Sequence, residues 1–170
     1  GCSHGALAQR FRGEVLDDVQ IKAVLPDILS FCEARDGYKP SDIDLSMCYH
    51  GLGHIAMFIT GGSPQRSISV CEKITTKTSG ISYVRLCVEG LFMTVFQGGS
   101  DPDDLSLVKN LRPLPKDVTS FCNRYKDYWD ICRRESYPLF LADVQTPEGL
   151  TNFCSYATNK QIALGFGKLN

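Results

Sequence analysis

The amino-acid sequence predicts an all-α fold built of disulfide-stapled helical hairpins, stacked in the manner of an α-solenoid. Three observations lead to this prediction. Two short motifs that contain cysteine alternate along the 170 residues. The cysteines of these motifs are regularly spaced. Sustained period-two alternation of apolar and polar residues, which is typical of β-strands, is scarce.

Length and composition limit the class of protein. A chain of 170 residues is the size of one domain or one small repeat array, and its 43% hydrophobic and 22% charged residues are close to the globular average. No apolar run approaches the roughly 20 residues that a membrane-spanning helix needs. The net charge of -1 and the lack of a basic stripe argue against a nucleic-acid partner. We therefore expect a protein partner or self-association.

The first motif, called here the long-helix motif, begins at a cysteine and has a glycine three positions later. It occurs at residues 2–5, 48–51 and 87–90. The second, called the short-helix motif, runs from a proline to a cysteine that follows a hydrophobic residue. It occurs at residues 26–32, 64–71, 115–122 and 147–154. The two motifs alternate, so each short helix is expected to pair with a long one.

Both motifs are predicted to be helical. Proline is favoured at the first position of a helix, and the Ser-Pro pair at 63–64 and the Thr-Pro pair at 146–147 place a good N-cap residue before it. Apolar residues recur at helical spacing over residues 44–59, and the glycine pair at 61–62 is expected to end that helix.

These elements predict one helical-repeat domain that covers residues 1–170. Its expected hairpins and half-repeats are, approximately, 26–60, 64–97 and 115–140, with half-repeats at 1–13 and 147–170. Half-repeats without polar caps tend to stack. We therefore expect the two ends to meet, either within one chain or head to tail between chains.

The cysteine spacing predicts three disulfide bridges. Fifteen residues separate Cys32 from Cys48, and the same number separates Cys71 from Cys87. Residues at equal distances on either side of a hairpin turn face each other, so these pairs are expected to be bridged. The expected bridges are Cys32–Cys48, Cys71–Cys87 and Cys122–Cys132. Cys2 and Cys154 are left to pair with each other, with another copy or with other segments. Disulfides favour a secreted or extracytoplasmic protein over a cytosolic zinc protein.

The strongest chemical signal is a face of the second long helix. His50 and His54 are four positions apart, which places both imidazoles on one side of a helix, and Met47 and Met57 continue the same spacing. The glycines at 51 and 53 indicate that another helix, a ligand or a substrate approaches closely.

The repeats place further residues at equivalent positions. His4 and Glu89 correspond to His50, and Met93 corresponds to His54. Stacked repeats would let His4, His50, His54 and Glu89 converge in one groove. Such a set suits zinc or iron, and added methionines would suit copper. The alternative is that the histidines brace helix packing and the methionines fill the core.

The segments 48–54 and 87–93 resemble a group of secreted, cysteine-rich helical proteins of bacteria and archaea with no assigned activity. Its members carry repeated C-x-H-G-x-G-H and C-x-x-G-x-F-M motifs with a cysteine about 15 residues upstream, and the similarity covers roughly residues 1–97. The resemblance implies export and a repeated helical core, and it implies no reaction.

Two functional hypotheses follow. In the first, the protein is an extracellular structural or interaction module that binds a protein or assembles with itself. In the second, it is a metal-binding protein or metalloenzyme that uses the His/Glu cluster. The sequence has no nucleophile elbow, P-loop or dinucleotide-binding glycine pattern, so it names no catalytic residue and leaves open whether the protein is an enzyme.

Overall fold

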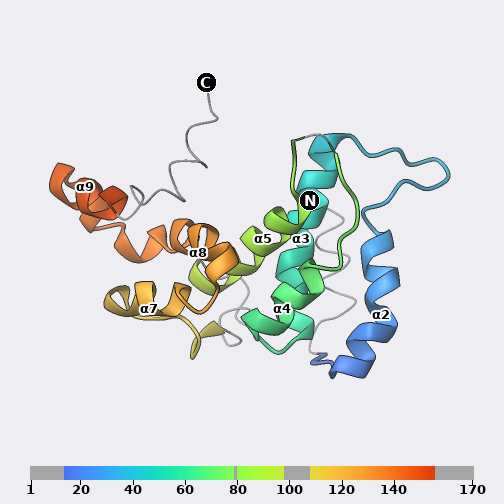
Figure 1. Ribbon diagram of the computed structural model, residues 1–170, viewed down its shortest axis with the longest axis horizontal. Coiled ribbons are helices and arrows are strands. Elements are labelled where there is room, and N and C mark those ends of the chain that lie inside the picture. The colour runs from blue at the N-terminus through green and yellow to red at the C-terminus, as the bar shows by residue number, and fades with distance from the viewer. Residues whose placement is uncertain (1–13, 79, 98–107, 156–170) are drawn as a thin grey trace. The chain divides into compact units, whose positions relative to one another are not determined.

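The computed structural model describes residues 14–78, 80–97 and 108–155, and in this part of the chain it confirms an all-α, disulfide-stapled fold (Figure 1). The described α-helices are α2 (Asp18–Ser30), α3 (Asp42–Ile59), α4 (Pro64–Cys71), α5 (Tyr83–Gln97), α7 (Val118–Cys122), α8 (Trp129–Glu135) and α9 (Pro147–Ser155). Short 3₁₀ helices lie at Pro115–Asp117, Lys126–Tyr128, Tyr137–Phe140 and Asp143–Gln145. The described residues contain no β-strand, only isolated bridges between Arg35 and Tyr38 and between Thr78 and Ile81.

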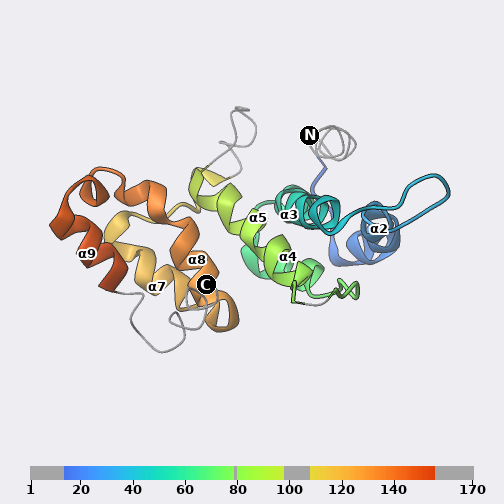
Figure 2. The same ribbon diagram turned by 90° about the horizontal axis from the view of Figure 1, so that it is seen from above.

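The chain divides into two compact units, Gly1–Arg112 and Pro113–Asn170. In the first unit, α3 lies between α2 and α5 (Figures 1 and 2). Each unit holds predicted hairpins, whereas the continuous solenoid over residues 1–170 stays a prediction. No helix in the described ranges is long and apolar enough to cross a membrane.

Helix α2 begins earlier than its proline predicts. Asp17 caps the helix: its carboxylate accepts a hydrogen bond from the Gln20 amide at 2.8 Å, and the Gln20 side chain accepts one from the Asp17 amide at 2.9 Å. This reciprocal capping box starts the helix at Asp18, so Pro26 lies inside it rather than at its first position. Proline there leaves one helical carbonyl without its usual N–H donor.

Helix α3 has strong signals at both ends. Ser41 and Asp44 form a second capping box at its start. At its end, Gly61 adopts a φ of 65°, the Gly61 amide donates to the Phe58 carbonyl, and the Gly62 amide donates to the Met57 carbonyl. These two bonds form a Schellman motif, which confirms that the glycine pair ends this helix.

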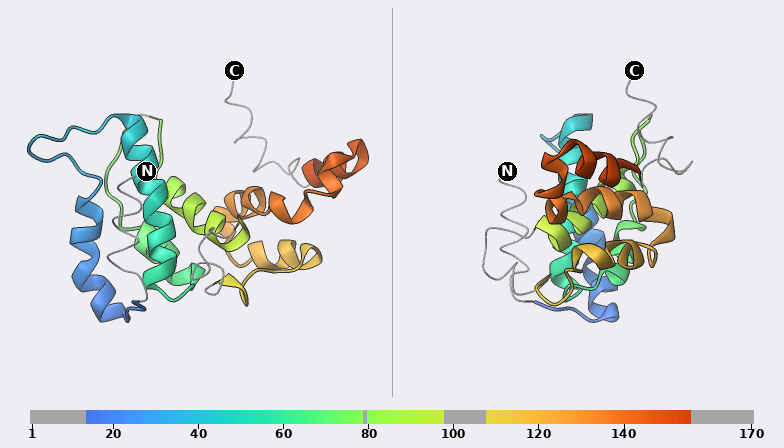
Figure 3. Two further views of the ribbon diagram at one scale, coloured as in Figure 1. Left: turned by 180° about the vertical axis from the view of Figure 1, so that it is seen from behind. Right: turned by 90° about the vertical axis from the view of Figure 1, so that its left-hand side faces the viewer.

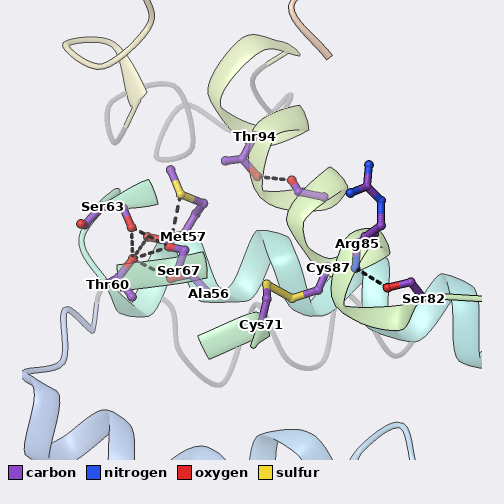
Figure 4. Close-up of a disulfide and its surroundings, with 11 residues drawn as sticks. Ala56, Met57, Thr60, Ser63, Ser67, Cys71, Ser82, Arg85, Cys87 and Thr94 are labelled. Carbon is purple, nitrogen blue, oxygen red and sulfur yellow. Dashed lines mark hydrogen bonds between the residues drawn. A yellow bond between two sulfur atoms is a disulfide. The ribbon is translucent and has the colours of Figure 1, made fainter. Parts of the chain in front are cut away.

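The turn from α3 into α4 is held by hydroxyl groups in the interior (Figure 4). The buried Thr60 hydroxyl lies 2.7 Å from the Ala56 carbonyl and 2.7 Å from the Ser67 hydroxyl. Ser63 caps α4 and Pro64 occupies its first turn, as the sequence predicts.

Arg66 ties the start of the described chain to this turn. Its guanidinium lies 2.8 Å from the Asp18 carboxylate and donates hydrogen bonds to the carbonyl oxygens of Leu16, at 2.8 Å, and Thr60, at 3.2 Å. One side chain therefore connects the entry to α2, the end of α3 and the start of α4, a role that the sequence did not indicate.

The three predicted disulfide bridges are present in the structure. They join Cys32 to Cys48, Cys71 to Cys87, and Cys122 to Cys132, each with a Cα–Cα distance of 5.6 Å. The first fastens the segment after α2 to α3, the second fastens α4 to α5 (Figure 4), and the third fastens α7 to α8. In the chain-entropy interpretation, a bridge that closes a loop of about 15 residues stabilises the fold by about 3 kcal/mol.

The core of the first unit lies mainly between α3 and α5. Most of the predicted apolar stripe of α3 is buried, and Leu52, Ile55 and Ile59 are completely inaccessible. Tyr49 is also buried: its ring lies 4.9 Å from the Tyr83 ring, and its hydroxyl lies 2.6 Å from the Thr76 hydroxyl. Burial raises the pKa of Tyr49, which favours its neutral form.

Two glycines allow α3 and α5 to pack closely. A Cβ atom on Gly53 would overlap the Cys87 carbonyl oxygen and lie 2.6 Å from the Leu91 nitrogen. A Cβ atom on Gly90 would overlap the His50 carbonyl oxygen. The sequence left open whether a helix, a ligand or a substrate approaches α3 at its glycines. At Gly53 the structure shows that helix α5 does so.

The second unit contains α7, α8 and α9, which run from yellow to red in Figure 3. Thr146 caps α9 by accepting a hydrogen bond from the Gly149 amide at 3.0 Å, which confirms the predicted start of this helix. The Arg133 side chain of α8 is nearly buried, and its guanidinium carbon lies 4.7 Å and 4.5 Å from the ring centres of Phe140 and Phe153. Cation–π contacts therefore hold α8 to the chain that follows it.

Replacing Gly53 or Gly90 with alanine tests the close packing. Alanine improves intrinsic helix propensity, yet we expect each variant to lose about 1–3 kcal/mol of unfolding free energy because the added methyl group meets backbone atoms that cannot move aside. Urea unfolding with the disulfides intact measures this. Ser69→Ala on the exposed side of α4 is the surface control and should be nearly neutral. Equal or greater stability of both glycine variants would contradict the packing.

Candidate functional site

The candidate site is built on α3 and α5. His50 and His54 lie one turn apart on α3, and their rings meet edge to face with a centroid separation of 5.2 Å. Both residues are half-buried. Because Gly90 brings the backbone of α5 against the His50 carbonyl, side chains of α5 reach the two imidazoles.

Each imidazole has one nitrogen directed at the other ring and one near a group from α5. The two Nε2 atoms are 3.3 Å apart. His54 Nδ1 lies 2.7 Å from the Thr94 hydroxyl, and His50 Nδ1 lies 3.8 Å from a carboxylate oxygen of Glu89. The cluster is therefore a row that runs from Glu89 through His50 and His54 to Thr94.

The Thr94 hydroxyl contacts both His54 and the backbone of its own helix. This hydroxyl donates its hydrogen to the Gly90 carbonyl at 3.0 Å, a bond drawn in Figure 4. With the hydroxyl hydrogen on the Gly90 carbonyl, the Thr94 oxygen would accept from His54 Nδ1, and the neutral His54 ring would then carry its proton on Nδ1. In that arrangement a neutral His50 would donate its Nε2–H to His54 Nε2.

Glu89 lies on the opposite side of His50 from the second ring. The carboxylate and the His50 side chain are 30% and 19% exposed, so the contact is partly shielded from solvent. The Glu89 carboxylate therefore lies beside His50, away from the contact between the two rings.

The structure brings together some of the predicted site residues and separates others. His50, His54 and Glu89 are neighbours, as predicted. Met47 and Met57, which continue the spacing of the histidines, lie in different surroundings: Met47 is 61% exposed, whereas Met57 is completely buried, with its sulfur 3.4 Å from the Ser67 hydroxyl (Figure 4). The row from Met47 through the two histidines to Met57 therefore begins at the surface and ends in the core.

His4 and Cys2 lie outside the described residues. Within the described ranges, no group of three or more His, Cys, Asp or Glu side chains is arranged to hold a metal ion. Glu89 is near Nδ1 of His50, whereas the two histidines face each other through Nε2. The convergence of His4, His50, His54 and Glu89 on one metal ion therefore stays a prediction. In the structure, Glu89 contacts His50 on the side of the ring away from His54.

Thr94 was missed by the sequence reasoning, although a signal existed. It is the one polar residue in the apolar run from Leu91 to Phe96, and only 4% of it is exposed. A hydroxyl group inside such a run needs a hydrogen-bond partner, which points to a polar group on the helix packed against it.

Cys154 in α9 is exposed and is a free cysteine in the structure. The second unit also has a pocket of about 370 Å³. It is lined by Arg133, Phe140, Ala142, Asp143, Thr146, Glu148, Gly149, Asn152 and Phe153. Arg133 stacks on both aromatic rings here, so its charge serves the packing of the unit.

Comparisons of the chain with protein-family models, with curated proteins and with solved structures find no match.

The tautomer of His54 can be observed directly. At about pH 9, well above the ordinary histidine pKa of about 6.5, we expect long-range ¹⁵N–¹H spectra to show His54 protonated on Nδ1 and His50 protonated on Nε2. In Thr94→Val the acceptor at Nδ1 is lost, so the His54 proton should redistribute towards Nε2. Protonation of His54 on Nε2 in the wild-type protein would contradict the proposed order of hydrogen bonds.

Proposed function

We propose that the protein is an extracytoplasmic, disulfide-stapled interaction module that associates with copies of itself through the outer face of α3. The observation that carries this proposal is an exposed apolar pair. Ile43 and Met47 lie one turn apart at the start of α3 and are 75% and 61% exposed. Large apolar side chains that adjoin on a helix surface are typical of protein-binding faces.

The helix that presents this pair is held rigidly. The Cys32–Cys48 bridge lies at the next turn of α3, and the capping box of Ser41 and Asp44 fixes its start. A preorganised surface loses little conformational entropy when it binds. Ile43 and Met47 could therefore be buried in a contact with little loss of backbone conformational entropy.

A second copy of the chain is the partner that the charge favours. With a net charge of -1, copies repel one another only weakly. The three bridges indicate an oxidising environment, in which the exposed Cys154 thiol can link one chain to another. Head-to-tail linkage through Cys2 is part of the proposal.

Charge substitution at the apolar pair tests self-association. We expect the sedimentation coefficient of the wild-type protein to rise with concentration, and Ile43→Lys/Met47→Lys to remain monomeric because lysine would be desolvated at the contact. The matched control is Val15→Lys/Val19→Lys, a second exposed pair four positions apart, 65% and 79% exposed near the start of α2, which should associate like the wild type. Monomeric wild-type protein throughout the series, or equal loss in both variants, would contradict the proposal.

The covalent part is tested separately on non-reducing gels. Reducible multimers are expected from the wild-type chain and should be absent from Cys154→Ser. Multimers that persist in Cys154→Ser would show that this thiol does not link the chains.

A further inference from the structure

We infer that the exposed face of α9 is a docking surface for residues 2–13 of a second copy of the chain, with Cys2 placed against Cys154. The inference rests on the proposed self-association and names the two surfaces of its head-to-tail contact. Its basis is a comparison of α9 with the short helices of the two complete hairpins at α4–α5 and α7–α8.

The short-helix motifs can be compared position by position. Those at 64–71, 115–122 and 147–154 have the same length from the proline to the cysteine. In the first two motifs the fourth, seventh and eighth positions are all buried, and the eighth carries the disulfide to the helix that follows, α5 or α8. The buried residues are Ser67, Val70 and Cys71 in α4, and Val118, Phe121 and Cys122 in α7.

In α9 the same three positions are uncovered. Leu150, at the fourth position, is 49% exposed, whereas its counterpart Val118 is 1% exposed. Phe153, at the seventh, is only half-buried, although its ring lies 5.3 Å from the Phe140 ring. Cys154, at the eighth, is exposed and is a free cysteine. Apolar side chains exposed beside a thiol, at positions that are otherwise covered, indicate a face for a partner helix.

The helix that fits this face carries the long-helix motif, because that motif supplies the second cysteine of the first two bridges. Residues 2–5 have this motif, although they lie outside the described residues. Further along the same segment, Leu7 and Phe11 take the places of two completely buried residues of α5, Phe92 and Phe96. The segment therefore has the cysteine and the apolar side chains that a partner of α9 needs.

The charges of the two segments are complementary. Residues 2–13 contain Arg10 and Arg12 and no acidic side chain. Residues 143–154 contain Asp143 and Glu148 and no basic side chain. Opposite charges favour contact between the two different segments, and like charges oppose contact of either segment with its own counterpart. Charge therefore favours a bridge from Cys2 to Cys154 over one between two copies of Cys154.

The bridge forms by two exchanges with a low-molecular-weight disulfide, such as oxidised glutathione. The Cys154 thiolate attacks one sulfur of that disulfide and releases one glutathione thiolate. The Cys2 thiolate of the second copy then attacks the Cys154 sulfur and releases the other glutathione thiolate. Two protein thiols thereby lose two protons and two electrons, and one small disulfide is reduced to two thiols.

Mixed isotope labelling identifies the partner. Chains of residues 1–170 with and without ¹⁵N are mixed in glutathione buffer, quenched with acid, and mapped by mass spectrometry. We expect a pair of peptides joined through Cys2 and Cys154 in which one peptide is labelled and the other is not. Bridges only between peptides of like label would show closure within one chain and would overturn the inference. A predominant bridge between two copies of Cys154 would also overturn it.

A lysine on the docking face tests the surface with the thiol intact. Leu150→Lys should slow formation of the mixed bridge by about tenfold or more, because the lysine would be desolvated under the partner helix. Leu150→Met keeps an apolar side chain and should bridge at the wild-type rate. The matched control is Gln145→Lys, which adds the same charge at an exposed residue just before α9 and should also match the wild type. Equal rates in Leu150→Lys and the wild type would show that the thiols meet without docking.

Sedimentation of Cys154→Ser separates this inference from the proposed function. Association through Ile43 and Met47 does not involve the thiol, so it should persist in this variant. Persisting association together with no mixed bridge in the wild type would overturn the α9 surface and leave the proposed function standing. Monomeric protein at every concentration in both chains would contradict the proposed function and the inference that rests on it.

Discussion

The close contact between α3 and α5 is the constraint on which the first unit depends. Where Gly53 and Gly90 face the opposite helix, backbone meets backbone, and no larger residue fits without moving one helix. Such contact lets apolar side chains on either side interdigitate over the whole crossing, including Leu52 and Phe92, which are both completely buried. The bridges at Cys48 and Cys87 fasten each of these helices to a neighbouring segment, so the contact is held from both sides.

The same contact creates the polar row. At ordinary helix separations, a carboxylate or hydroxyl on α5 would meet water rather than an imidazole on α3. Because Gly90 lies against the His50 carbonyl, Glu89 and Thr94 reach the two rings from adjacent turns of α5. The sequence left structural bracing of the helix contact as one interpretation of the histidines, and the contacts of this row are of that kind: each imidazole lies against a side chain of α5 and against the other ring.

Features that depend on residues close together in the sequence could be predicted. Equal spacing predicted the bridges Cys32–Cys48 and Cys71–Cys87, and the repeat of the motifs at a shorter spacing predicted Cys122–Cys132. The Ser-Pro pair at 63–64 predicted a helix start, because capping is set by neighbouring residues. Features set by a distant contact could not. The partner of Thr94 is 40 positions away, and Arg66 reaches Leu16 across 50 positions. The prediction that a helix starts at Pro26 was wrong, because the capping box of Asp17 and Gln20 starts α2 eight residues earlier, at Asp18.

The most direct test of the helix contact is a nuclear Overhauser measurement on the wild-type protein. With α3 and α5 in contact, the Gly53 α-protons should show strong cross-peaks to the Leu91 amide, and the Gly90 α-protons should show cross-peaks to the His50 ring. These peaks report the backbone approach itself and not its energetic consequence. Their absence, in a protein with all three bridges formed and helix content intact, would contradict the account.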